Sequence, residues 1–229
     1  MTAKSDGDRS LTGAPLPPTK PVSPDDGAHH PRPAEVADIP RWRRAERTRL
    51  RNERMAQSVE TRSNSSQLLA DHIFEFVSER FSGASGRVFS GYWPIKGEPN
   101  LRPAMIKLHE AGVLVALPVV EVKASPMVFR RWTPDTKMVR GDWNIPVPPP
   151  EAELVLPDIT LAPLVGWDRQ GYRLGYGGGY FDRTLASLNP RPFTIGVGWQ
   201  AAHIQTIYPQ PHDISLDVII TENGLQLPR

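Results

Sequence analysis

The sequence feature that most restricts the fold of this chain is a glycine-rich string from Arg173 to Arg183, which reads RLGYGGGYFDR. It follows an apolar segment and precedes a run compatible with a helix, Tyr180 to Leu188. Densely spaced glycines allow positive φ and let the backbone approach a ligand closely. Successive N–H groups ahead of a helix N-terminus form an anion-binding concavity. The string therefore predicts a phosphate-binding turn, with a plain flexible loop as the alternative.

Charged side chains around the glycines favour the phosphate-binding interpretation. Arg173 and Arg183 bracket the turn with guanidinium groups suited to phosphate. Asp182 adds a hard oxygen ligand of the kind that Mg²⁺ uses beside phosphates. The string is not a Walker A loop, because no Gly-Lys-Ser/Thr follows, and it lacks the acidic residue of a dinucleotide-binding turn.

Composition predicts a soluble globular protein that works in the cytoplasm. The chain has 229 residues, of which 39% are hydrophobic and 23% charged, which suits one domain with an appendage. A net charge of +2 implies no general attraction to nucleic acid. The absence of cysteine excludes disulfides, thiolate metal sites and cysteine nucleophiles. No apolar run reaches the roughly 20 residues that span a bilayer, and we see no secretory signal.

The first 40 residues differ from the rest of the chain. Met1 to Pro40 holds 8 of the 25 prolines and has no periodic apolar pattern. Such a segment cannot bury enough surface to offset its conformational entropy, so we expect residues 1–40 to form a disordered Pro-rich tail. His29 and His30 lack the further ligands that a metal site requires. Residues 41–229 are expected to form a single α/β domain.

Apolar runs that alternate with helical patterns predict the architecture of this domain. Arg87 to Trp93 indicates a strand, Pro103 to Ala111 a helix, and Val113 to Val120 a second strand, which together make a βαβ unit. Further strands are expected at 127–132, 154–157, 193–199 and 218–221. The fold class that follows is α/β: a three-layer, mostly parallel open sheet flanked by helices, preceded by the disordered tail.

The segment Arg41 to Arg54 contains seven arginines and two glutamates. The first expectation for such a run is a solvated helix face. A nucleic-acid-binding patch is the alternative, although aromatic residues among the arginines stop at Trp42.

The glycine string as a whole resembles the LGYGGGYYDR signature of the 5-formyltetrahydrofolate cyclo-ligase family, also called methenyltetrahydrofolate synthetase. Other parts of the chain, from about Arg41 to Gly224, match the same family in order and spacing. These matches are Tyr92, Pro94 and Glu98 in a Tyr-x-Pro-x-x-x-Glu pattern, the string Trp143-Asn144-Ile145-Pro146, Asp168 and Gly171 before the glycines, and His212-Asp213 with Asp217 near the end.

The resemblance implies a ligase of one-carbon metabolism that converts 5-formyltetrahydrofolate, ATP and Mg²⁺ into 5,10-methenyltetrahydrofolate, ADP and phosphate. It implies no nucleophilic side chain. The implied residues for ATP are Arg43, Arg44, Arg47, Arg173, Leu174, Gly175, Tyr176, Gly177, Gly178, Gly179, Tyr180, Phe181 and Asp182, with Arg54 as a further basic position. Those for folate are Glu98, Trp143 and Tyr180. Those for the metal are Asp182 and Asp213, with Asp217 in reserve.

Two other function classes stay open at this point. A relative with the same ATP site could act on a different acceptor, because arginine replaces the lysine of the family in the first helix. An RNA-binding module could use Arg41 to Arg54. The favoured interpretation predicts a monomer that binds a reduced folate, with no nucleic acid and no membrane as partners.

Overall fold

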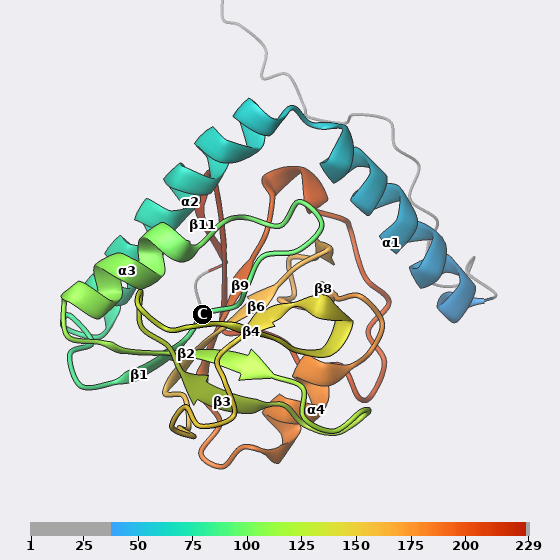
Figure 1. Cartoon of the computed structure of the whole chain (residues 1–229). Helices are drawn as coiled ribbons and strands as arrows, with labels where there is room; N and C mark the ends of the chain where they lie inside the picture. The colour runs from blue at the N-terminus through green and yellow to red at the C-terminus, as the bar shows by residue number, and fades with distance from the viewer. Residues whose placement is uncertain (1–37, 228–229) are drawn as a thin grey trace, which may run out of the picture. The chain divides into compact units, whose positions relative to one another are not determined.

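The computed structural model describes residues 38–227, and most of the predicted tail lies outside them. Four α-helices are present in this part of the chain: α1 (Ile39–Ala56), α2 (Val59–Arg80), α3 (Arg102–Glu110) and α4 (Tyr180–Ser187). The two N-terminal helices meet at an angle (Figure 1), where Ser58 caps α2 and its Oγ accepts the N–H of Thr61 at 3.0 Å. Serine is a preferred N-cap because its oxygen satisfies an otherwise unpaired N–H of the first turn.

A seven-stranded sheet forms the centre of the domain, in the order β11-β10-β9-β6-β1-β2-β3. The five central strands are parallel, and the two edge strands are antiparallel to their neighbours. This sheet confirms the predicted α/β class with a mostly parallel sheet. The strands are β1 (Val88–Ser90), β2 (Leu114–Val119), β3 (Val128–Arg131), β6 (Ile159–Pro163), β9 (Phe193–Val197), β10 (Val218–Thr221) and β11 (Gly224–Leu227).

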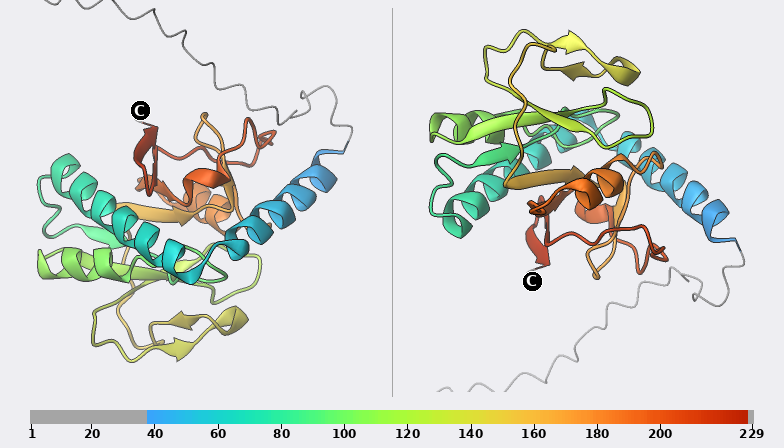
Figure 2. Two further views of the ribbon diagram at one scale, coloured as in Figure 1. Left: turned by 90° about the horizontal axis from the view of Figure 1, so that it is seen from above. Right: turned by 90° about the horizontal axis from the view of Figure 1, so that it is seen from below.

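Two hydrophobic clusters lie on opposite faces of the sheet, since neighbouring strand residues point to opposite sides. Ile220 and Leu161 join α2 and α3 in one cluster, and these two helices lie side by side (Figures 1 and 2). Ile219 and Ala162 join the second cluster, which includes Leu185 of α4. The helices therefore cover the sheet from both sides, as a three-layer arrangement requires.

One predicted strand, Leu154 to Pro157, is wrong. Leu154 and Leu156 are 59% and 71% exposed, and the segment touches the sheet only through an isolated bridge from Leu154 to Arg130. The strand that lies between β1 and β9 is instead β6, which includes the Leu161-Ala162-Pro163 stretch. The short apolar run before Pro157 has strand-like composition, but ladder pairing with both neighbours falls on residues 159–163.

Two small hairpins carry the loops that matter for function. One pairs β4 (Val139–Arg140) with β5 (Pro146–Val147). The other pairs β7 (Gly166–Trp167) with β8 (Arg173–Leu174), immediately before the glycines. Buried Asp168 holds the second hairpin, because its Oδ1 accepts the N–H groups of Gln170 and Tyr172 and its Oδ2 accepts that of Ile207.

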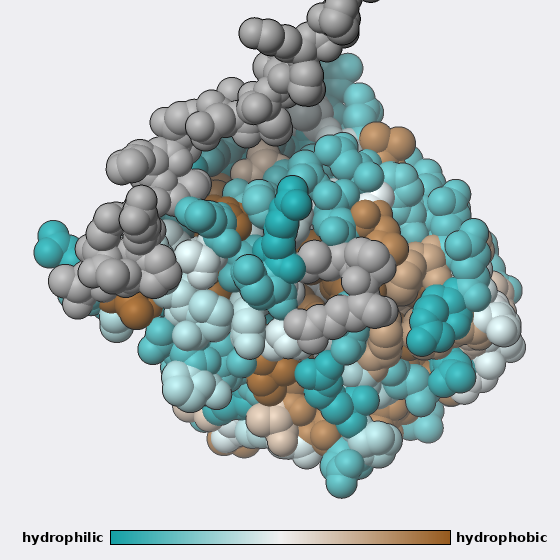
Figure 3. All heavy atoms as spheres, turned by 180° about the vertical axis from the view of Figure 1, so that it is seen from behind, coloured by the Kyte–Doolittle hydropathy of each residue, from teal (hydrophilic) through white to brown (hydrophobic). Residues whose placement is uncertain are grey.

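No helix within residues 38–227 is long and apolar enough to cross a membrane. On the face opposite that of Figure 1, hydrophobic and hydrophilic residues are interspersed among the atoms that are not grey (Figure 3). Single exposed apolar residues are normal on soluble proteins.

Candidate active site

A cavity lies where the order of the parallel strands reverses. From β1 the chain continues to β2 on one side, whereas β6, β9 and β10 follow on the other side. Ligands of open α/β sheets bind outside the carboxyl ends of the strands at such a switch point. The cavity is lined there by Tyr92 after β1, Val120 after β2 and Pro163 at the end of β6.

The glycine loop borders this cavity and leads into α4. Gly177 and Gly179 have φ values of +98° and +65°, which L side chains rarely adopt. Gly179 is also the N-cap of α4. Among the described residues, the backbone N–H groups of Gly177, Gly178 and Gly179 donate no hydrogen bond. Free N–H groups at a helix N-terminus form an anion site, so the geometry fits the predicted phosphate-binding turn.

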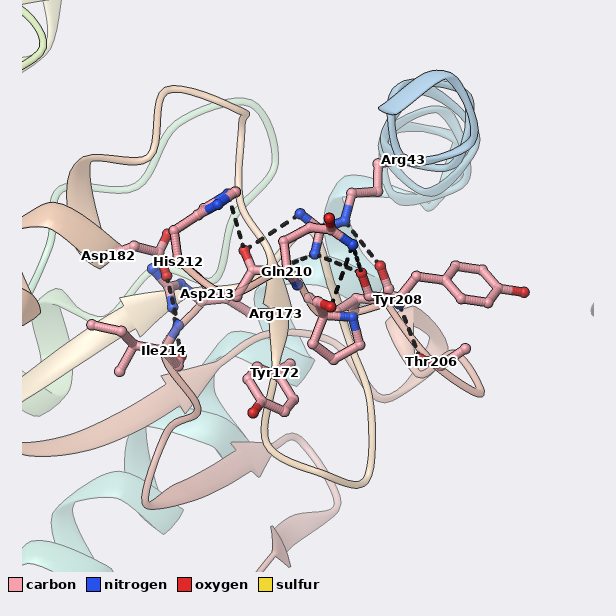
Figure 4. Close-up of polar contacts among 12 residues, drawn as sticks. Arg43, Tyr172, Arg173, Asp182, Thr206, Tyr208, Gln210, His212, Asp213 and Ile214 are labelled. Carbon is pink, nitrogen blue, oxygen red and sulfur yellow. Dashed lines mark hydrogen bonds and ion pairs between the residues drawn. The ribbon is translucent and has the colours of Figure 1, made fainter. Parts of the chain in front are cut away.

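Arg43 reaches from α1 to a loop far away in the sequence (Figure 4). Its Nε donates to the carbonyl oxygen of Ile207 at 2.9 Å, and its guanidinium group is paired with the carboxylate of Asp213. Burial raises the pKa of Asp213, but the hydrogen bonds from Arg43 and from the Gln210 N–H outweigh it, so that the pKa lies below its ordinary value. Arg43 thus already has a carboxylate partner beside the cavity.

Two further arginines line the cavity close to the glycine loop. Nε of Arg47 donates to the carbonyl oxygen of Gly175 at 2.8 Å. Arg173 is 7% exposed, and its Nη2 lies 3.2 Å from Oδ2 of Asp182 in the first turn of α4. Burial lowers the pKa of both guanidinium groups, because a low-dielectric environment disfavours the charged form.

Glu98 is the buried carboxylate of the cavity, 8% exposed. It ends a tight turn in which Lys96 and Gly97 both have positive φ, and it accepts the N–H of Ile95 at 2.9 Å. Nε1 of Trp199 donates to the carbonyl oxygen of Gly97 at 3.1 Å and holds the turn in place. Burial raises the pKa of Glu98 to about 7.

Trp143 forms an aromatic wall of the cavity together with Tyr180. The two ring centroids are 5.4 Å apart at an interplanar angle of 83°. Trp143 is 62% exposed and has φ +52°, an uncommon value for a bulky residue. An aromatic side chain that is largely exposed, contacts Tyr180 at the edge of the cavity and is held in a sparsely populated backbone conformation suits ligand contact.

Nearly all the site residues expected from the sequence line this one cavity. The exceptions are Arg44, which is exposed on α1, Leu174, which is fully buried in β8, and two further arginines that do not line the cavity, Arg54 and Arg183. Asp217, the reserve metal ligand, pairs with Arg191 away from the cavity. Residues 38–227 contain no group of three or more His, Asp or Glu side chains placed to hold a metal ion. The sequence did not single out Met127 and Val147 as cavity residues, because an apolar residue in a strand carries no signal beyond burial.

A switch-point cavity with a glycine loop at a helix N-terminus, three arginines and a buried carboxylate is typical of an α/β enzyme, and its positive charge suits an anionic ligand. The chain belongs to the 5-formyltetrahydrofolate cyclo-ligase family, which it matches over residues 39–222.

Individual relatives agree with this assignment. The 5-formyltetrahydrofolate cyclo-ligase of Haemophilus influenzae is 27% identical over 181 residues, covering 76% of this chain and 95% of that protein. The cyclo-ligase of Mycolicibacterium smegmatis is 32% identical over 145 residues, covering 60% and 74%. The NMR structure of Aquifex aeolicus 5,10-methenyltetrahydrofolate synthetase matches with a TM-score of 0.69 at 28% identity, covering 82% and 93%.

Proposed function

We propose that this protein catalyses the ATP- and Mg²⁺-dependent conversion of 5-formyltetrahydrofolate to 5,10-methenyltetrahydrofolate, with release of ADP and phosphate. The observation that supports the proposal is that one cavity is lined both by groups suited to phosphate and by a buried carboxylate with aromatic rings. The former are the glycine loop with Arg47 and Arg173, and the latter are Glu98 and the rings of Trp143 and Tyr180.

The chemistry explains why both sites are needed. A formamide oxygen is a poor leaving group. Transfer of the γ-phosphoryl group to this oxygen makes it a good one, so that N10 of the folate attacks the formyl carbon, phosphate departs and N10 loses its proton. The tasks of the protein are to position the two substrates and to neutralise charge.

The side chains divide these tasks between them. The free N–H groups of the loop, Arg47 and Arg173 would hold the triphosphate, with Arg43 beside them. The carboxylate of Glu98 would accept two N–H bonds from the aminopyrimidine edge of the pterin. The rings of Trp143 and Tyr180 would pack on the flat ligand.

Mg²⁺, when bound, would neutralise charge on the phosphates. Asp182 fits this role, because it lies in the first turn after the glycine loop and Mg²⁺ is commonly held by one or two carboxylates plus phosphate oxygens. Asp213 remains the second proposed ligand, and it would have to exchange its bond with Arg43 for the metal.

The test is direct. Purified protein is mixed with 5-formyltetrahydrofolate and Mg·ATP, and both the methenyl chromophore and ADP are measured. We expect both products, and Arg47→Met is expected to raise KM for ATP about tenfold or more, the effect of losing a charged hydrogen bond. Arg49→Met is the matched control, because Arg49 lies on the same helix but pairs with Glu46 and Glu53 outside the cavity.

The alternatives give different outcomes in the same assay. ADP without the chromophore would indicate a different acceptor and contradict the proposal. Salt-sensitive RNA binding without ATP affinity would also contradict it. A single domain spanning residues 41–229, a monomeric state and a cytoplasmic location remain predictions.

A further inference from the structure

Arg54, in the last turn of α1, is buried next to the cavity without lining it. The residue is only 5% exposed. Its Nη2 donates to the hydroxyl oxygen of Tyr176 at 2.7 Å, whereas its Nε and Nη1 are buried without a hydrogen-bond partner among the described residues. A guanidinium group buried with a single partner costs stability. Such a cost suggests a role other than holding the fold together.

Tyr176 connects Arg54 to the carboxylate of the cavity. It follows Gly175 in the glycine loop, it lines the same cavity as Glu98, and its hydroxyl group interacts with the Glu98 carboxylate. The hydroxyl oxygen accepts a hydrogen bond from Arg54, which leaves the hydroxyl hydrogen for the carboxylate. Arg54, Tyr176 and Glu98 therefore form a continuous row of polar groups from the first helix to the proposed pterin site.

We propose that Arg54 is a positioning residue that, through the hydroxyl of Tyr176, orients the carboxylate of Glu98 for folate binding. The inference rests on the proposed function, because it assigns Arg54 to the folate half of the cavity. It also gives Tyr176 a role in folate binding, although the residue lies in the glycine loop. The loop would in this way contact both ligand sites.

The groups that face Glu98 set the sign of the effect. Arg54 and Lys96 supply positive charge, and the hydroxyl of Tyr176 supplies a hydrogen bond, all of which favour the carboxylate. Burial opposes them, and the hydroxyl of Tyr92 is nearby, buried and without a partner within residues 38–227. Loss of Arg54 would therefore raise the pH at which Glu98 becomes ionised.

The experiment compares pH profiles of variants. For Arg54→Met, we expect kcat/KM for 5-formyltetrahydrofolate at pH 7 to fall about tenfold, with the acidic limb of its pH profile moved to higher pH. KM for ATP should change less than about twofold. Folate affinity measured by quenching of tryptophan fluorescence should show the same pH displacement without turnover. Circular dichroism confirms that each variant is folded.

Arg51→Met is the matched control. Cζ of Arg51 lies 5.4 Å from the ring centroid of Tyr176 and Cζ of Arg54 lies 5.9 Å from it, but Arg51 makes no hydrogen bond to the hydroxyl. The Arg51→Met variant should leave the pH profile unchanged. If Arg54→Met does not fold, Tyr176→Phe carries the test, because it removes only the connecting hydroxyl and should displace the acidic limb in the same direction.

The double variant separates a relay from two independent effects. If Arg54 acts through Tyr176, then Arg54→Met combined with Tyr176→Phe should be no worse than the more severe single variant. Additive effects of the two substitutions would overturn the inference. So would a folded Arg54→Met protein that still makes the methenyl product and whose acidic limb has not moved. Either result would leave the proposed function standing. A wild-type protein that makes no methenyl product would instead reject the proposed function.

Discussion

Replacement of Glu98 by glutamine should make the protein more stable at neutral and alkaline pH. Burial raises the pKa of Glu98 from its ordinary value of 4.5 to about 7 in the folded state. Between these two pH values the folded protein holds a proton that the unfolded chain has released. Stability from this group is therefore fully present below pH 4.5 and is lost as the pH rises through about 7.

The structure sets the size of the effect. At about 1.36 kcal/mol per pH unit, the rise in pKa corresponds to about 3 kcal/mol of unfolding free energy. Glutamine has nearly the same shape and keeps an oxygen for the N–H of Ile95, but it cannot ionise. The stability difference between Glu98→Gln and wild type should thus grow in favour of the variant by about 3 kcal/mol between pH 4.5 and pH 8.

Urea unfolding followed by circular dichroism at several pH values measures this difference. The contributions of the other titrating groups to the unfolding free energy are the same in both proteins and cancel. The same variant should bind 5-formyltetrahydrofolate poorly, since the amide presents one acceptor oxygen where the carboxylate presents two. Parallel stability curves, with a difference constant to within about 0.5 kcal/mol across this range, would refute the reasoning about the buried carboxylate.

Two other substitutions test neighbouring parts of the cavity. Asp213→Asn should lower the unfolding free energy at pH 7 by about 1–3 kcal/mol, because it leaves Arg43 without its charged partner. Since the pKa of Asp213 lies below its ordinary value, the stability difference from wild type should shrink as the pH falls through the acid range. An equal deficit at all pH values would contradict this ion pair. Trp143→Ala should raise KM for folate about tenfold while changing stability by less than about 0.5 kcal/mol, since its side chain is largely exposed, and Trp143→Phe should keep most of the affinity. An unchanged KM in a steady-state assay would remove Trp143 from the folate site.

Local sequence patterns predict the elements of this fold that bury apolar residues continuously. The runs at 114–119, 193–197 and 218–221 are strands of the parallel core, and the predicted helix after the glycines is present as α4. The edge strand β11 and the central strand β6 were not predicted, because the position of each depends on pairing with distant strands. Pairing register is a tertiary property that a short apolar run does not encode.

The site shows the same division between local and distant information. The glycine loop and Glu98 could be located from residue types that have a chemical reason to be there. The bond from Arg54 to Tyr176 could not, because the two residues are 122 positions apart and the family resemblance assigns each of them separately to the ATP site. Arg44 and Arg43 are adjacent and chemically identical, and only the helix packing turns Arg43 toward the cavity.

The attachment of α1 has a consequence for synthesis on the ribosome. Arg43 emerges early, yet its partners Ile207 and Asp213 lie 164 and 170 positions later. Chains emerge from the N-terminus, and contacts between distant segments form last. Arg43 can therefore make these contacts only after the segment up to Asp213 has been synthesised, and until then α1 lacks the bonds that attach it beside the cavity.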